Sequence, residues 1–233
     1  MKRLVPLGLV LASLLAALAI GSPNDARGQS AGLVSSVLNS MERNRQSLKS
    51  LRSSITMEKY NPQIGLTEKF NGVVLYVPGA GKNDSVRIEW SSPQHEILAV
   101  SNGQYTLFRP RLKVAYKGSV RSSKGKPGVM LNMLDMSASE LKNSYEPFQD
   151  VREETLWGSV GTIHLKLVPK GRDQSYKYAE IWVDSMGMPV QVKWVEKNDD
   201  ATTIRLSGPE RNVKISADEF NVKLEPDVKI IRG

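Results

Sequence analysis

The fold class is decided by residues 176–196, which read YKYAEIWVDSMGMPVQVKWVE. In both halves of this stretch, apolar and polar residues alternate, which is typical of β-strands that bury one face. The connection between the halves, DSMGMP, is short and rich in residues that favour turns. The stretch is therefore predicted to be an antiparallel hairpin that packs one face against a core.

The same pattern recurs along most of the chain on both sides of this hairpin. Downstream it appears in TTIRLSG, NVKIS and FNVKLEP, and upstream in TIHLKLVPK, LKVAYKG, QYTLFR, EILAV, SVRIEW, EKFNGVVLYV and a segment near residues 55–60. We expect about ten or eleven strands in sequence, separated by turns. The predicted fold is mainly β within the α+β class: a strongly curved antiparallel sheet that forms an incomplete barrel.

Few helices are available to cover this sheet. An N-terminal helix is predicted from apolar residues that recur on one helical face, among them Val37, Leu38 and Met41. Helices that lie in the hollow of a curled sheet leave a cavity between the layers, and sheets of this size are wide enough to hold a ligand.

A second helical segment interrupts the β-pattern at residues 128–148, GVMLNMLDMSASELKNSYEPF. Ser137 and Glu140 have the spacing of a capping box at a helix start. The segment also contains Met130, Met133 and Met136, and methionine is flexible enough to repack around variable partners. Two interpretations follow: an ordinary core helix, or a soft apolar lid over a cavity.

The first residues have the organisation of a secretory signal peptide. Lys2 and Arg3 precede an apolar run from residue 4 to residue 20, and small and polar residues follow. We expect residues 1–28 to be the signal peptide and residues 29–233 to form a single domain. A retained membrane anchor is the alternative. The chain contains 0 cysteines, so it has neither disulfides nor the acylated cysteine of a bacterial lipoprotein.

Positive charge is concentrated in the middle of a chain whose formal charge is +8. Residues 97–134 contain no Asp or Glu but seven Arg and Lys residues, several of them in the basic loop Lys117–Lys126. Export argues against nucleic acid as a partner, which leaves two interpretations. The block contacts an anionic membrane surface, or it is a solvated loop that aids solubility.

No residue pattern points to catalysis or to a metal. The only histidines, His95 and His164, are far apart in sequence, so a zinc site of the usual kind is excluded. Ser139 and Lys142 match the S-x-x-K pattern of penicillin-recognising enzymes, but the supporting motifs are missing. We therefore expect no enzymatic activity, no catalytic residue, no cofactor and no bound metal.

Several segments together resemble the outer-membrane lipoprotein carrier protein family, LolA. The resemblance rests on the L-x-L-x-P-K strand at residues 165–170, on TTIRLS, and on the closing FNVKLEPDVKII. In the middle of the chain, VRIEWSSPQHEILAVSNGQYTLFRPRLKVAY is similar to the family's run of strands and turns. The order of these elements holds over residues 33–232.

The resemblance implies a soluble, monomeric periplasmic carrier with helices as a lid over an apolar cavity. It implies that the carrier takes acylated lipoproteins from an inner-membrane ABC transporter and delivers them to an outer-membrane acceptor. In this context we favour the lid interpretation of residues 128–148. The residues expected to contact acyl chains are Val37, Leu38, Met41, Ile88, Trp90, Met130, Met133 and Leu134.

The resemblance also implies a basic residue that latches the lid. The family's lysine-arginine-proline turn reads Gly-Lys-Asn here, so Lys82 keeps the charge and loses the planar donor fork of arginine. Arg87 matches a basic position of many relatives and is the second candidate for the latch or for contact with a headgroup. Two other functions remain open: a carrier of another envelope lipid, and a periplasmic sensor of acylated ligands.

Overall fold

Twelve strands form one open sheet in the computed structural model, which describes residues 23–80, 83–120, 136–171 and 176–233, with side chains from residue 31 onward. The order across the sheet is β12-β6-β5-β4-β3-β2-β1-β11-β10-β9-β8-β7. The strands are β1 (Leu51–Asn61), β2 (Leu66–Val77), β3 (Ser85–Ser92), β4 (Glu96–Ser101), β5 (Gln104–Arg109), β6 (Val114–Ser119), β7 (Gln149–Leu156), β8 (Val160–Leu167), β9 (Tyr176–Asp184), β10 (Pro189–Glu196), β11 (Ala201–Arg211) and β12 (Lys229–Arg232).

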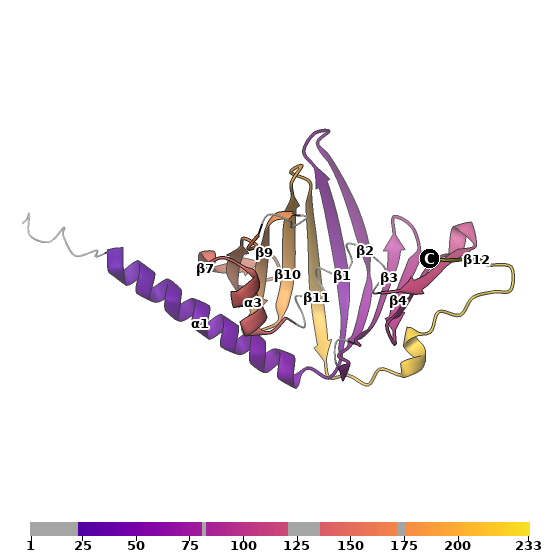
Figure 1. The fold of residues 1–233 in the computed structure, drawn as a ribbon, viewed down its shortest axis with the longest axis horizontal. Coiled ribbons are helices and arrows are strands. Elements are labelled where there is room, and N and C mark those ends of the chain that lie inside the picture. The colour runs from indigo at the N-terminus through magenta and orange to yellow at the C-terminus, as the bar shows by residue number, and fades with distance from the viewer. Residues whose placement is uncertain (1–22, 81–82, 121–135, 172–175) are drawn as a thin grey trace, which may run out of the picture.

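Nearly all neighbouring strands are antiparallel, as the sequence predicts, and only β12 runs parallel to its neighbour β6. The sheet does not close on itself, so β7 and β12 lie at its two ends (Figure 1). The predicted class, a mainly β open sheet with an N-terminal helix, is confirmed. The structure has two strands that were not predicted, β7 and β12, which carry little alternation, whereas the predicted strands at NVKIS and FNVKLEP are absent from the described residues 212–226.

The helices gather at one end of the sheet. Helix α1 (Pro23–Ser47) contacts β7 and the short helix α3 (Ala138–Ser144), and Figure 1 shows both helices beside the half of the sheet that ends in β7. Val37, Leu38 and Met41 form the buried side of α1, as predicted. Ser137 caps α3 in the expected capping box with Glu140.

One face of the sheet packs against these helices in the core, and we call it the helix face. Directly paired residues of antiparallel strands project to the same side, so the register extends this face from strand to strand. Its buried members in the half beneath the helices include Ile55, Leu206, Ile204, Val192, Ile181 and Leu165. Together with Val37, Leu38 and Met41 they belong to one continuous core.

The opposite face is covered in part by the chain after β11. The 3-10 helix η3 (Ala217–Phe220) contacts β3 and β4, and its Phe220 is buried. This segment is attached to the first strand region, where the Ser50 hydroxyl donates to the Val213 carbonyl at 2.5 Å. The chain then continues to β12 at the end of the sheet remote from β7 (Figure 1).

Candidate functional site: the apolar helix face

Five of the residues predicted to contact acyl chains come together in the core. Val37, Leu38 and Met41 of α1 and Ile88 and Trp90 of β3 are all buried and belong to one cluster. Residues far apart in sequence thus share one apolar interior. Met130, Met133 and Leu134, together with Lys82, lie outside the residues that the structure describes. That any of these side chains contacts an acyl chain remains a prediction.

The apolar surface of the helix face continues beyond the buried core. Register pairs join Ile88 to Leu98, Leu98 to Leu107, and Leu107 to Tyr116. The parallel pairing of the last strand then places Ile231 beside Tyr116. These side chains form a single cross-strand line that we call the apolar row: Ile88, Leu98, Leu107, Tyr116 and Ile231.

Burial decreases along the apolar row from the core toward the end of the sheet. Ile88 is 6% exposed and Ile231 is 37% exposed, whereas Leu98, Leu107 and Tyr116 are partly buried. Half-buried apolar side chains in an unbroken line retain surface that a hydrocarbon chain can cover. No site was predicted from the sequence at Leu98, Leu107 or Tyr116. The hairpin turn at residues 101–103 was a usable signal, because it fixes the register that places Leu98 beside Leu107.

An aromatic pair borders the row where it enters the core. The rings of Phe70 and Trp90 meet edge to face, with centroids 5.9 Å apart. Phe70 is paired in register with Met57, and both are partly buried against the core. This geometry gives the inner end of the row a wall of large, polarizable side chains.

The two helices are joined at the first turn of α3. The backbone N–H of Ala138 donates to a carboxylate oxygen of Glu42 at 3.4 Å, and Arg45 donates to the other oxygen of the same carboxylate at 2.7 Å. The side-chain amide of Gln46 donates to the same oxygen of Glu42 as Arg45 does. The hydrogen bond from Arg45 is the main reason that the pKa of Glu42 lies below its ordinary value, with smaller contributions from Gln46 and Ala138. The ionised carboxylate thus holds the N-terminus of α3.

The other end of α3 is attached more firmly. The hydroxyls of Tyr145 and Tyr176 are 2.8 Å apart, and burial, with help from this hydrogen bond, raises the pKa of Tyr145 above its ordinary range. Two backbone hydrogen bonds connect the same region to the chain after β8, from Glu146 to Val168 and from Lys170 to Ser144. The start of α3 is thus held by one side-chain carboxylate, and its end by a buried hydroxyl pair and two backbone hydrogen bonds.

Arg87 lies on the face opposite the apolar row. Its guanidinium pairs with Glu89 at 2.7 Å and donates to the Glu219 carbonyl at 3.3 Å. Both contacts line a groove of about 780 Å³ on β1, β2 and β3, next to η3. One of the described contacts of Arg87 therefore joins β3 to the C-terminal segment, and its role as a lid latch remains a prediction.

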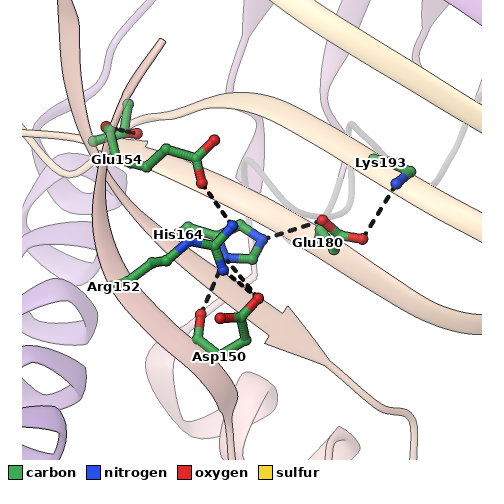
Figure 2. A network of polar contacts seen from close by, with 7 residues as sticks. Asp150, Arg152, Glu154, His164, Glu180 and Lys193 are labelled. Carbon is green, nitrogen blue, oxygen red and sulfur yellow. Dashed lines mark hydrogen bonds and ion pairs between the residues drawn. The ribbon is translucent and has the colours of Figure 1, made fainter.

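A polar network holds the edge strand β7 against the sheet (Figure 2). His164 on β8 is fully buried, and one ring nitrogen lies 3.0 Å from the Asp150 carbonyl while the other lies 3.2 Å from a Glu180 carboxylate oxygen. Both neighbours of the ring are hydrogen-bond acceptors. Glu180 also pairs with Lys193 at 3.3 Å, and Arg152 pairs with Asp150 and Glu154.

In the described ranges, no group of three His, Asp or Glu side chains lies close enough to hold a metal ion. None of the helices in the described part of the chain combines the length and apolarity needed to cross a membrane. The most extended feature of the described geometry is the apolar surface of the helix face.

Comparison with known proteins identifies the fold and the family. The family model for the outer membrane lipoprotein carrier protein LolA matches residues 80–223. A search of curated proteins found no match.

Two solved structures with TM-scores above 0.5 share the fold. MucB aligns with a TM-score of 0.53 at 12% identity, over 82% of this chain and 62% of MucB. An uncharacterized conserved protein from Thermus thermophilus aligns with a TM-score of 0.51 at 11% identity, over 84% of this chain and 97% of that protein. A LolA superfamily protein from Nitrosomonas europaea gives a TM-score of 0.41 at 12% identity, over 81% and 97% of the two chains.

Proposed function

The chain belongs to the LolA family, and we propose that it is a periplasmic carrier that binds the acyl chains of lipoproteins on its helix face. It is proposed to take acylated lipoproteins from an inner-membrane ABC transporter and to deliver them to an outer-membrane acceptor. The proposed form is a monomer that starts as an exported precursor with residues 1–28 as its signal peptide, and it carries out no chemical reaction.

The apolar row is the observation that supports this function best. It provides a line of half-buried hydrocarbon that begins in the core at Ile88 and reaches the end of the sheet at Ile231. An acyl chain is a flexible hydrocarbon of similar shape, and it needs apolar contact along its length rather than polar groups at fixed positions. The five core residues predicted from the sequence would line the inner end of this surface.

The energetics of acyl transfer explain why a carrier is needed. Each methylene that leaves an apolar environment costs about 0.8 kcal/mol, so a lipoprotein with several chains does not cross water unaided. A carrier must offer comparable burial and still release the cargo. Partial exposure of Leu98, Leu107 and Tyr116 suits this balance, because part of the bound chain would face a cover that opens.

The test is to purify the protein from the envelope of cells that express it and to identify bound molecules by mass spectrometry. Recovery of acylated lipoproteins supports the proposal. Recovery of phospholipid or glycolipid alone would instead identify a carrier of another envelope lipid. A protein that carries nothing and takes up no fluorescent fatty acid would refute acyl binding altogether.

A further inference from the structure

The end of the sheet that carries β12 has a distinctive surface, which we call the basic rim. It consists of β12, the adjacent strand β6 and the turn η2 (Pro110–Leu112) that precedes β6. The backbone N–H of Lys229 donates to the Lys113 carbonyl at 2.8 Å, which joins the turn to the last strand. The rim residues used below are Arg111, Leu112, Lys117, Lys229, Ile230, Ile231 and Arg232.

Positive charge on this rim is largely uncompensated. Lys113 pairs with Asp227, and Arg109 pairs with Glu96 at 2.6 Å. In contrast, the structure shows no ion pair between any described acidic residue and the four remaining cations, Arg111, Lys117, Lys229 and Arg232. Arg111 and Lys117 lie within residues 97–134, which contain no Asp or Glu, whereas Lys229 and Arg232 come from the last strand.

Apolar side chains are exposed among these cations. Leu112 is 62% exposed, Ile230 is 42% exposed and Ile231 is 37% exposed. Every residue of β12 is exposed, and cations occupy both of its ends. Exposed aliphatic side chains flanked by Lys and Arg suit the interface of a bilayer, where the aliphatic groups enter the acyl boundary and the cations meet phosphate groups.

The position of the rim relative to the apolar row adds a second argument. Ile231 belongs to both, since it is paired with Tyr116 on the helix face and lies on the last strand of the sheet. A hydrocarbon chain that leaves a bilayer at this edge therefore meets apolar surface leading inward to Leu107, Leu98 and Ile88. The cations lie at the same edge, where the headgroups would remain.

We propose that the basic rim docks on a bilayer that contains anionic phospholipids, and that the acyl chains handed over there enter and leave the apolar row at Ile231. The second clause rests on the proposed carrier function, whereas the first stands without it. The contact is electrostatic in its first stage, so it weakens as the ionic strength rises.

Flotation with lipid vesicles tests the docking. The protein, in the form in which the expressing cell processes it, is mixed with vesicles of phosphatidylcholine or of phosphatidylcholine with phosphatidylglycerol. The rim variant replaces Arg111, Lys117, Lys229 and Arg232 by Gln. Its matched control replaces four exposed cations elsewhere, Arg43, Lys49, Lys142 and Lys214, by Gln, which changes the net charge equally.

We expect the unmodified protein and the control to float preferentially with the anionic vesicles. Binding of the rim variant to those vesicles should fall about tenfold or more, because each cation near an anionic surface strengthens binding several-fold. Equal loss in the rim variant and the control, or no preference for anionic vesicles in the unmodified protein, would overturn the proposal. The double substitution Ile230→Ser and Ile231→Ser, with all four cations kept, should weaken the binding that remains at high salt.

Uptake of a fluorescent fatty acid from water, measured on the same proteins, separates this proposal from the proposed function. The rim variant should take up the fatty acid normally, since the inner part of the apolar row is intact. If the unmodified protein floats with anionic vesicles yet takes up no fatty acid, the carrier function fails and the docking surface stands. The reverse result refutes the docking surface and leaves the carrier.

Discussion

Gly187 lies against the carbonyl of Ser40, so that a β-carbon at residue 187 would come within 2.1 Å of that oxygen. This approach joins the β9–β10 turn to the middle of α1, next to the buried Met41. Gly187 also has a φ of +82°, a region that other residues adopt only with strain. The absence of a side chain at Gly187 thereby allows α1 to pack closely against the β9–β10 turn.

The Gly187→Ala variant should therefore lose more stability than backbone strain alone predicts. Alanine in the left-handed region costs about 1–2 kcal/mol, and displacement of α1 adds the loss of packing at Val37, Leu38 and Met41. Gly208 is a matched control, because its φ is +60° and nothing lies within 4 Å of the added carbon. Urea unfolding of both variants measures the difference. Equal losses of unfolding free energy would show that the contact with Ser40 is unimportant.

Substitution in the apolar row should separate acyl binding from folding. Leu107 is only partly buried, so Leu107→Asn should leave the protein folded while it interrupts the apolar row with an amide. We expect affinity for a fluorescent fatty acid to fall about fivefold to tenfold, which corresponds to the loss of one or two methylene contacts. Thr106→Asn is the control, because Thr106 is the preceding residue of the same strand and projects to the opposite face.

The alternating segments made most of this fold predictable, whereas the edges of the sheet were not. Strand β7 contains the run Asp150-Val151-Arg152-Glu153-Glu154, whose charges suit an exposed edge and remove the apolar alternation. Conversely, residues 212–216 and most of 220–226 alternate like strands but lie outside any strand. They bury side chains such as Phe220 against the opposite face instead of pairing with a neighbour.

The candidate site, too, was predictable only where the sequence shows clear periodicity. The sequence identifies Val37, Leu38, Met41, Ile88 and Trp90 as members of one apolar interior because helical and strand periodicity show which face of each element is buried. The continuation to Tyr116 and Ile231 requires the order of strands across the sheet, which periodicity does not contain. The parallel addition of β12 to β6 in particular joins residues that are more than a hundred positions apart.

The contact between α1 and α3 should depend on pH through Glu42. Its folded-state pKa is below its ordinary value of 4.5, so the ionised carboxylate stabilises the fold above that pH, and this contribution disappears as the pH falls through the lower folded value. Glu42→Gln should therefore reduce stability at neutral pH and flatten its decline below pH 4.5. Chemical unfolding of both proteins between neutral and acidic pH measures the two curves. Curves that remain parallel throughout would show that Glu42 contributes nothing in its ionised form.

Removal of His164 should loosen the edge strand β7. In His164→Leu, the Asp150 carbonyl and the Glu180 carboxylate both lose their contact with the ring, and Glu180 keeps Lys193 as a partner. Because Asp150 is exposed and Glu180 keeps Lys193, water and Lys193 offset part of the lost hydrogen bonding, and we expect a decrease of about 1–2 kcal/mol in the free energy of unfolding. Amide hydrogen exchange should accelerate first in β7, where the carbonyl acceptor lies.

The matched control is His95→Leu, since His95 is exposed and its contact with Glu89 is at the surface. That variant should change stability by less than about 0.5 kcal/mol. Similar behaviour of the two histidine variants would mean that β7 is held by its strand pairing alone.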